Sequence, residues 1–179
     1  KGDIMFSFKP ADFVPYKNEE VLERVRNIPR EELDKHPNPD FKIHIVANPA
    51  AIWIGDMVAR IQRSDMLNEK CVMILPNPCP AIYESVAETI NLLNISCRNL
   101  YVFTMDEWAD NDGNIAPITY QRGFSYSQLK YFYGKIREDL RMPLDHIHYP
   151  TTENITYYSK MITECGEGGA DICYSGPGW

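Results

Sequence analysis

The sequence contains no apolar run long enough to cross a membrane and no excess of positive charge. Its formal net charge of −7 argues against a nucleic-acid partner, because nucleic-acid-binding proteins carry basic patches. An anionic small molecule is still compatible, since backbone amides or a locally basic site can bind it. The first residues, Lys1–Phe8, lack the apolar core of a signal peptide. We therefore expect no membrane association and no nucleic-acid partner.

Cysteine pairs of the CxxC type are also absent. An odd number of cysteines without a disulfide framework predicts a reducing, cytoplasmic location. Cys71 and Cys173 lie in apolar, strand-like runs, which is typical of small core residues. His146 and His148 alternate along a short strand, but no carboxylate or thiol follows at a convincing spacing. The sequence therefore predicts neither disulfides nor a metal site.

What the chain does contain is a regular alternation of strand and helix patterns. We expect residues 1–40 to form an N-terminal arm with one helix, capped by Asn18, and residues 41–179 to form an α/β domain. The predicted strands cover residues 41–47, 71–75, 100–104, 146–149 and 171–174. The predicted helices cover residues 49 to about 64, 81–93, 126–140 and 152 to about 165. This order predicts a mostly parallel sheet with helices on both faces.

The last predicted strand is followed by a glycine-rich turn, Ser175–Gly178, where a further helix is expected. We therefore expect the chain to be part of a longer protein, with a sheet that is incomplete at its C-terminal end. Such a sheet exposes an edge and an apolar surface. A homo-oligomer is the assembly that we expect to cover them.

The most informative segment is the buried strand at residues 100–104 and the two acids that follow it, Asp106 and Glu107. In parallel α/β sheets, ligands bind beyond the carboxyl ends of the strands. A carboxylate there can act as a general base if burial raises its pKa. Residue type alone favours the simpler interpretation of solvated acids at a strand end. Because neighbouring residues on an extended backbone point in opposite directions, only one of the two should face a substrate.

Two turns at other strand ends are candidate binding segments. The turn Pro76–Pro80 joins a strand to a helix, where Asn77 and Cys79 offer amides or side chains to a ligand. Its prolines have no N–H, so a rigid structural turn is the stronger interpretation from chemistry alone. In the last turn, Gly176 and Gly178 would let the backbone approach a ligand, or they simply close the strand.

The loop at residues 109–124 is long for a compact domain, and loops of that length often have a function. Tyrosines follow it in sequence, and their rings can stack on a sugar. Core and interface positions are the more common role of such residues. The tyrosines concerned are Tyr126, Tyr131, Tyr133, Tyr157 and Tyr158.

Taken in order, these segments resemble the glucosamine-6-phosphate deaminase/isomerase family. The segments are LPNPCP at 75–80, LYVFTMDEW at 100–108, SYSQLKYFY at 125–133 and ADICYSGPG at 170–178. FTMDEW is the most specific, because it is similar to the family's F-N-M-D-E-Y, and the resemblance extends from about Lys42 to the C-terminus. It implies a Rossmann-like α/β/α fold and conversion of an amino-sugar phosphate to a ketose phosphate and ammonia, without a metal or redox cofactor.

The resemblance also implies roles for particular residues. Asp106 corresponds to the family's aspartate base, which moves a proton between two sugar carbons, and Glu107 to a neighbour that supports the loop. Residues 75–80 take the place of the L-P-T-G-G-T-P phosphate loop, and residues 175–178 that of a G-G-x-G turn. The glycines of the phosphate loop are replaced by prolines here. The family's later D-G-H-I-A-F-N-E-P motif would lie beyond Trp179.

Three functions are compatible with this sequence. The leading hypothesis is an isomerase/deaminase acting on a sugar phosphate, with Asp106 as the base. A lactone hydrolase of the same fold is a second, although those enzymes usually have arginine where Trp108 stands. A non-catalytic sugar-phosphate sensor is a third, which the altered phosphate loop favours and the retained acid pair disfavours.

Overall fold

The computed structural model describes residues 15–176, and the contacts of the chain divide it into two units, Lys1–Ala47 and Asn48–Trp179. In the first unit, α1 (Glu19–Arg26) is followed by a 3-10 turn at Arg30–Glu32. The Asn18 side chain accepts a hydrogen bond from the backbone N–H of Val21 at 3.1 Å. This is the N-cap that the sequence predicts.

The strand predicted at residues 41–47 is wrong, because the backbone there is irregular. Phe41 and Ile45 are 56% and 60% exposed. A strand is stabilised by a paired neighbour and one buried face, and the described part of the chain provides this segment with neither. An alternating apolar pattern alone was therefore insufficient to form a strand.

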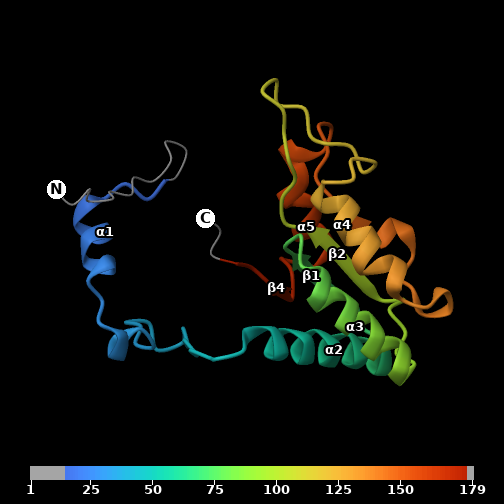
Figure 1. The fold of residues 1–179 in the computed structure, drawn as a ribbon, viewed down its shortest axis with the longest axis horizontal. Coiled ribbons are helices and arrows are strands. Elements are labelled where there is room, and N and C mark those ends of the chain that lie inside the picture. The colour runs from blue at the N-terminus through green and yellow to red at the C-terminus, as the bar shows by residue number, and fades with distance from the viewer. Residues whose placement is uncertain (1–14, 177–179) are drawn as a thin grey trace, which may run out of the picture. The chain divides into compact units, whose positions relative to one another are not determined.

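The second unit is built on a four-stranded sheet in the order β3-β2-β1-β4, in which every pairing is parallel. Figure 1 labels three of these strands, β1, β2 and β4. The strands are β1 (Cys71–Leu75), β2 (Leu100–Thr104), β3 (Ile147–His148) and β4 (Ile172–Cys173). The central pair is in register from Cys71 opposite Leu100 to Leu75 opposite Thr104. The predicted α/β class with a parallel sheet is confirmed.

Helices cover both faces of this sheet. Two of them, α2 (Pro49–Leu67) and α3 (Pro80–Leu93), pack with α4 (Phe124–Tyr131) on the face that buries Leu100 and Val102. The opposite face is covered by α5 (Tyr158–Cys165), whose Tyr158 packs on Val72 and Phe103. His146 and His148 lie on this second face, stacked on Tyr101 and Phe103.

The two C-terminal helices differ from the sequence expectation. The helix predicted at residues 126–140 is α-helical only as far as Tyr131. It continues as 3-10 turns at Tyr133–Lys135 and Glu138–Leu140. Gly134 lies in the first of these turns, and glycine weakens a helix interior. The helix expected from Thr152 begins at Tyr158, after a 3-10 turn at Ile155–Tyr157.

Thr152 does not have the predicted role of a helix cap. Its hydroxyl accepts a hydrogen bond from the N–H of Ile115 at 2.8 Å, and so holds the long loop. All five cysteines are free; Cys71 is buried as expected, but Cys173 is exposed because it lies on the edge strand β4. None of the helices in the described residues combines the length and apolar character that a bilayer span requires.

Candidate functional site

The carboxyl ends of three strands meet at one edge of the sheet. The N–H of Met105, just past β2, donates to the carbonyl of Leu75 at the end of β1 at 2.9 Å. The Ser175 hydroxyl, just past β4, lies 3.9 Å from the sulfur of Met105. The parallel sheet thus brings together residues that lie about a hundred positions apart in the sequence. This is the edge at which open α/β proteins bind ligands.

A cavity of about 340 Å³ lies at this edge, beyond β2 and β3. Asp106 and Glu107 are its charged lining residues, and the other walls are mainly apolar. Those walls consist of Met105, Ala109, Gly113, Ile115, Pro150, Ile155 and Tyr158. The hydroxyl of Tyr158 donates to the carbonyls of Thr104 at 2.9 Å and His148 at 3.2 Å, so α5 is tied to the ends of both strands. The cavity therefore has one wall, formed by α5, that is fixed to the sheet.

Asp106 is positioned by β2, which ends two residues before it. Partial burial raises the pKa of its carboxyl, and the neighbouring Glu107 carboxylate raises it further. The side chain still reaches solvent. A carboxylate that is accessible and has a raised pKa is a better proton acceptor than an ordinary surface aspartate.

Glu107 has a different environment although it is the next residue. Its carboxylate accepts hydrogen bonds from the N–H groups of Trp108, Phe124 and Ser125 at 3.0, 2.9 and 2.7 Å. The Ser125 hydroxyl adds a fourth at 2.6 Å. Burial alone would raise the pKa of Glu107, but these four donors hold it below its usual range. Glu107 thus joins the end of β2 to the first turn of α4, where a negative charge is favourable.

Gly123 leaves room for this connection. A Cβ atom at that position would lie 3.3 Å from both carboxylate oxygens of Glu107 and 3.0 Å from the carbonyl of Tyr120. A larger residue would therefore push the carboxylate away from the helix. The close approach explains why a glycine precedes α4.

Asn77 faces α4 and lies outside the lining of the Asp106 cavity. Its amide donates to the side-chain oxygen of Gln128 at 3.0 Å. Gln128 is 1% exposed, as is Thr104 at the end of β2. Four buried side-chain atoms at this edge have no hydrogen-bond partner within the described chain: Asn77 Oδ1, Thr104 Oγ1, Ser127 Oγ and Gln128 Nε2. Donors and acceptors of this kind are costly to bury unless they are satisfied.

The remaining predicted binding residues are also outside the cavity lining. Cys79 is the N-cap of α3, and burial raises the pKa of its thiol, so it stays protonated and packs against the core. Gly176 is exposed, just past the β4 end. Gly178 lies outside the described residues. Between residues 15 and 176, no group of three or more potential ligands is arranged to hold a metal ion.

Sequence reasoning missed the wall formed by Tyr158 and Ile155 and the bond between Glu107 and Ser125. Tyr158 was considered only as a stacking or core aromatic. The missing information was tertiary, because α5 follows Glu107 by some fifty residues. The contact between Glu107 and Ser125 did have a signal in the sequence. Gly123, Phe124 and Ser125 open a helix, whose first N–H groups need an acceptor, and Glu107 earlier in the chain can supply one.

Comparison with solved structures finds the same fold in a monomeric glucosamine-6-phosphate deaminase of the NagB superfamily. The TM-score is 0.56 at 14% identity, over 69% of this chain and 48% of the deaminase. This chain therefore spans about half the length of that enzyme. A 6-phosphogluconolactonase from Thermotoga maritima matches with a TM-score of 0.46 at 16% identity, over 68% of this chain and 54% of the lactonase. No known protein family and no curated protein matches the sequence.

Proposed function

We propose that the protein acts on an amino-sugar phosphate, with Asp106 as the base. The 2-amino aldose isomerises to a ketose imine, and one water molecule then hydrolyses the imine to the ketose and ammonia. The observation that carries the proposal is the position of Asp106. It lines a cavity at the carboxyl edge of a parallel sheet, and its pKa is raised. The fold shared with a glucosamine-6-phosphate deaminase supports the choice of substrate class.

The chemistry needs one group that removes a proton from one carbon and returns it to the next. A carboxylate with a raised pKa suits this role, because it accepts the proton readily and releases it again. Glu107 is held by four hydrogen bonds, three of which come from the first turn of α4. We therefore assign Glu107 a positioning role and Asp106 the proton transfer.

The phosphate must be held by groups other than the lining of this cavity. No lysine, arginine or histidine is among its lining residues, and its two charged groups are carboxylates. The sugar's hydroxyl-bearing carbons suit this cavity, and its phosphate does not. Backbone amides near Asn77 and Gly176 are the candidate phosphate ligands at this sheet edge.

The test is ammonia release from glucosamine 6-phosphate by the full-length protein and its Asp106→Asn variant. General-base catalysis contributes about 10²- to 10⁴-fold, so we expect turnover to fall by at least two orders of magnitude. Asp145→Asn is the matched control, because Asp145 is exposed at the amino end of β3, away from this edge. Its turnover should equal that of the unmodified protein.

Retained ammonia release in Asp106→Asn would contradict the assignment of the base. Hydrolysis of 6-phosphogluconolactone, measured in parallel, identifies a lactone hydrolase if that reaction alone proceeds. Binding of glucosamine 6-phosphate without either reaction identifies a sensor. Circular dichroism of each variant establishes that a loss of turnover is not a loss of folding.

A further inference from the structure

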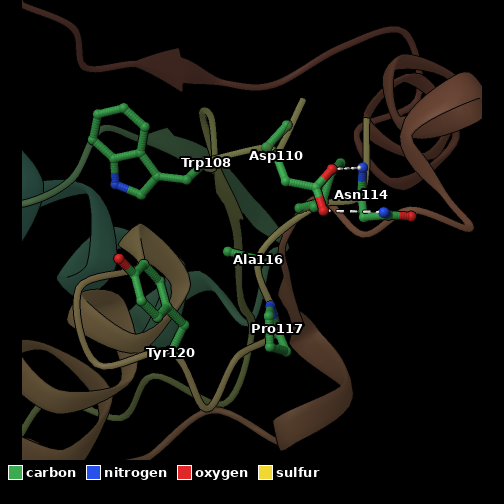
Figure 2. Close-up of a pocket in the computed structure, with 8 residues that line it drawn as sticks. Trp108, Asp110, Asn114, Ala116, Pro117 and Tyr120 are labelled. Atoms are coloured by element: carbon green, nitrogen blue, oxygen red, sulfur yellow. Dashed lines mark hydrogen bonds between the residues drawn. The ribbon is translucent and has the colours of Figure 1, made fainter. Parts of the chain in front are cut away.

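A second cavity, of about 370 Å³, lies on the loop between β2 and α4 (Figure 2). We call it the aromatic cup, and Trp108, Ala109, Asp110, Asn114, Ile115, Ala116, Pro117 and Tyr120 line it. In Figure 2 the rings of Trp108 and Tyr120 lie on one side, Asp110 and Asn114 on the other, and Ala116 and Pro117 between them. The cup is separate from the Asp106 cavity, and the two share only Ala109 and Ile115.

The two rings of the cup are unusually accessible for such large side chains. Trp108 is 55% exposed and Tyr120 is 44% exposed. Neither ring is loosely attached, because the Trp108 ring packs on Phe124 with 5.1 Å between the centroids. The N–H of Tyr120 donates to Pro117 and its carbonyl accepts from Gly123, both at 2.8 Å. Exposed aromatic faces held by a rigid backbone are typical of a binding surface.

The floor of the cup is a short two-stranded ribbon. Ala109 and Ile115 form an antiparallel bridge, and the N–H of Ala116 donates to the carbonyl of Trp108 at 2.8 Å. The hydroxyl of Thr152 anchors the ribbon from outside the loop through Ile115. Because these contacts exist without a ligand, little ordering would accompany binding, and this favours affinity.

Asp110 is ionised and held in a fixed orientation. Its carboxylate accepts from the N–H groups of Asp112 and Asn114 at 3.0 and 2.8 Å and from the Asn114 amide at 3.0 Å. These hydrogen bonds, the Asn114 side chain first, lower the pKa of Asp110. Three donors leave part of the carboxylate free to accept from a ligand.

Negative charge predominates around the cup. Residues 106–122 include four carboxylates and one guanidinium, Arg122. No cationic side chain lines the cup. Among residues 15–176, the carboxylates of Asp106, Glu107, Asp110 and Asp112 make no ion pair. The field therefore repels anions and attracts cations.

We propose that the aromatic cup binds a small organic ammonium ion. Tryptophan and tyrosine faces attract such a cation through their ring quadrupoles, tryptophan most strongly. The Asp110 carboxylate supplies a fixed opposite charge, and Ala116 and Pro117 contact the apolar body of the ligand. At about 370 Å³, the cup is near the lower end of ligand pockets, so one compact ligand fills it. The proposal rests on the cup alone and holds whether or not Asp106 is a catalytic base.

The test compares each cation with a neutral molecule of the same shape. The first pair is choline and 3,3-dimethyl-1-butanol, and the second is glucosamine and glucose. Binding is followed by NMR through the indole N–H signals of the full-length protein, and Trp108→Phe identifies the signal of Trp108. We expect at least one cation to shift that signal with an affinity ten-fold or more above that of its neutral counterpart. We also expect added salt to weaken the binding.

Variants locate the site. Tyr120→Ala should weaken binding of the cation at least five-fold, whereas Tyr157→Ala, which removes a tyrosine of similar exposure outside the cup, should not. Asp106→Asn should still prefer the cation to its neutral counterpart, because Asp106 does not line the cup, and this separates the site from the proposed reaction. Equal affinity for cation and neutral molecule, no shift by either cation, or equal effects of the two tyrosine variants would overturn the proposal.

Discussion

Two adjacent carboxylates at the end of β2 have pKa values that move in opposite directions. Burial and the neighbouring charge raise the pKa of Asp106, whereas four hydrogen bonds lower that of Glu107. Both acids line the cavity, but only Glu107 accepts hydrogen bonds from the first turn of α4. Two carboxylates thus differ in pKa because they differ in their hydrogen-bond donors and in their exposure to solvent.

Replacing Glu107 by glutamine should destabilise the fold at neutral pH. The amide keeps one acceptor but loses the charge, and hydrogen bonds to charged groups contribute about 1.5–3 kcal/mol. We expect urea unfolding to show a loss of about 1–3 kcal/mol at pH 7. Because the folded pKa is lowered, the carboxylate contributes above the unfolded value of 4.5. That contribution disappears as the pH falls through the folded value.

The difference in unfolding free energy between the unmodified protein and Glu107→Gln should therefore narrow as the pH falls below 4.5. Glu164→Gln is a suitable control, because Glu164 forms only an exposed ion pair with Lys160 and should matter little. A gap that is equal at pH 7 and in acid would show that Glu107 acts through packing and not through its charge.

The same substitution should also shift the pH profile of the proposed reaction. The Glu107 carboxylate is the second cause of the raised pKa of Asp106, after burial. Its removal should move the acidic limb of kcat/KM to lower pH, while burial keeps the limb above that of an ordinary aspartate. An unchanged limb in a folded variant would indicate that another group controls it.

Among the elements, α5 positions the cavity through one hydroxyl. Tyr158 bonds the carbonyls at the ends of β2 and β3 while its ring packs on Phe103. The strand β3 has only two residues, so such side-chain contacts contribute to its attachment. The helix thus closes the Asp106 cavity from the second face of the sheet.

Tyr158→Phe keeps the ring and removes both hydrogen bonds. We expect a loss of about 1–2 kcal/mol in unfolding free energy, since two buried carbonyls lose a donor. Tyr157→Phe is the matched control, because Tyr157 is the preceding residue and is 49% exposed. Equal effects of the two substitutions would mean that the hydroxyl of Tyr158 contributes nothing.

At the scale of the whole molecule, the second unit contains its own core. Every buried side chain of the described residues lies between Met57 and Tyr174. The sheet and the helices on both its faces all belong to that unit. Burial of apolar surface is the main stabilising contribution to folding, so this unit holds what it needs to fold.

A protein comprising residues 48–179 should therefore unfold in a single cooperative transition. We expect its Tm to lie within a few degrees of that of the 179-residue chain, measured by calorimetry. A broad transition without an enthalpy peak would show that residues 1–47 contribute to the core. The same preparation should keep the Trp108 indole signal at its position, because the loop lies within the unit.

The sequence alone determined the fold class and the central strands. A run of apolar, β-branched and aromatic residues followed by acids suffices to identify β2, and proline after asparagine identifies the start of α2, because these signals are local. The prediction of a strand at residues 41–47 was wrong for the opposite reason. The alternating pattern is local, but a strand also needs a paired neighbour from another part of the chain. Only the tertiary structure decided which of the two acids is bound to α4.

The same distinction applies to the ligand sites. The sequence placed Asp106 at a sheet edge, but the wall supplied by Tyr158 and the hydrogen bonds that Ser125 donates to Glu107 required the packed structure. The sequence marked the loop at residues 109–124 as long enough to have a function, but it did not predict the aromatic cup. Trp108 and Tyr120 are twelve residues apart, and a ribbon brings them to one cavity. Contacts between distant residues depend on how the elements pack, and packing is a property of the whole fold.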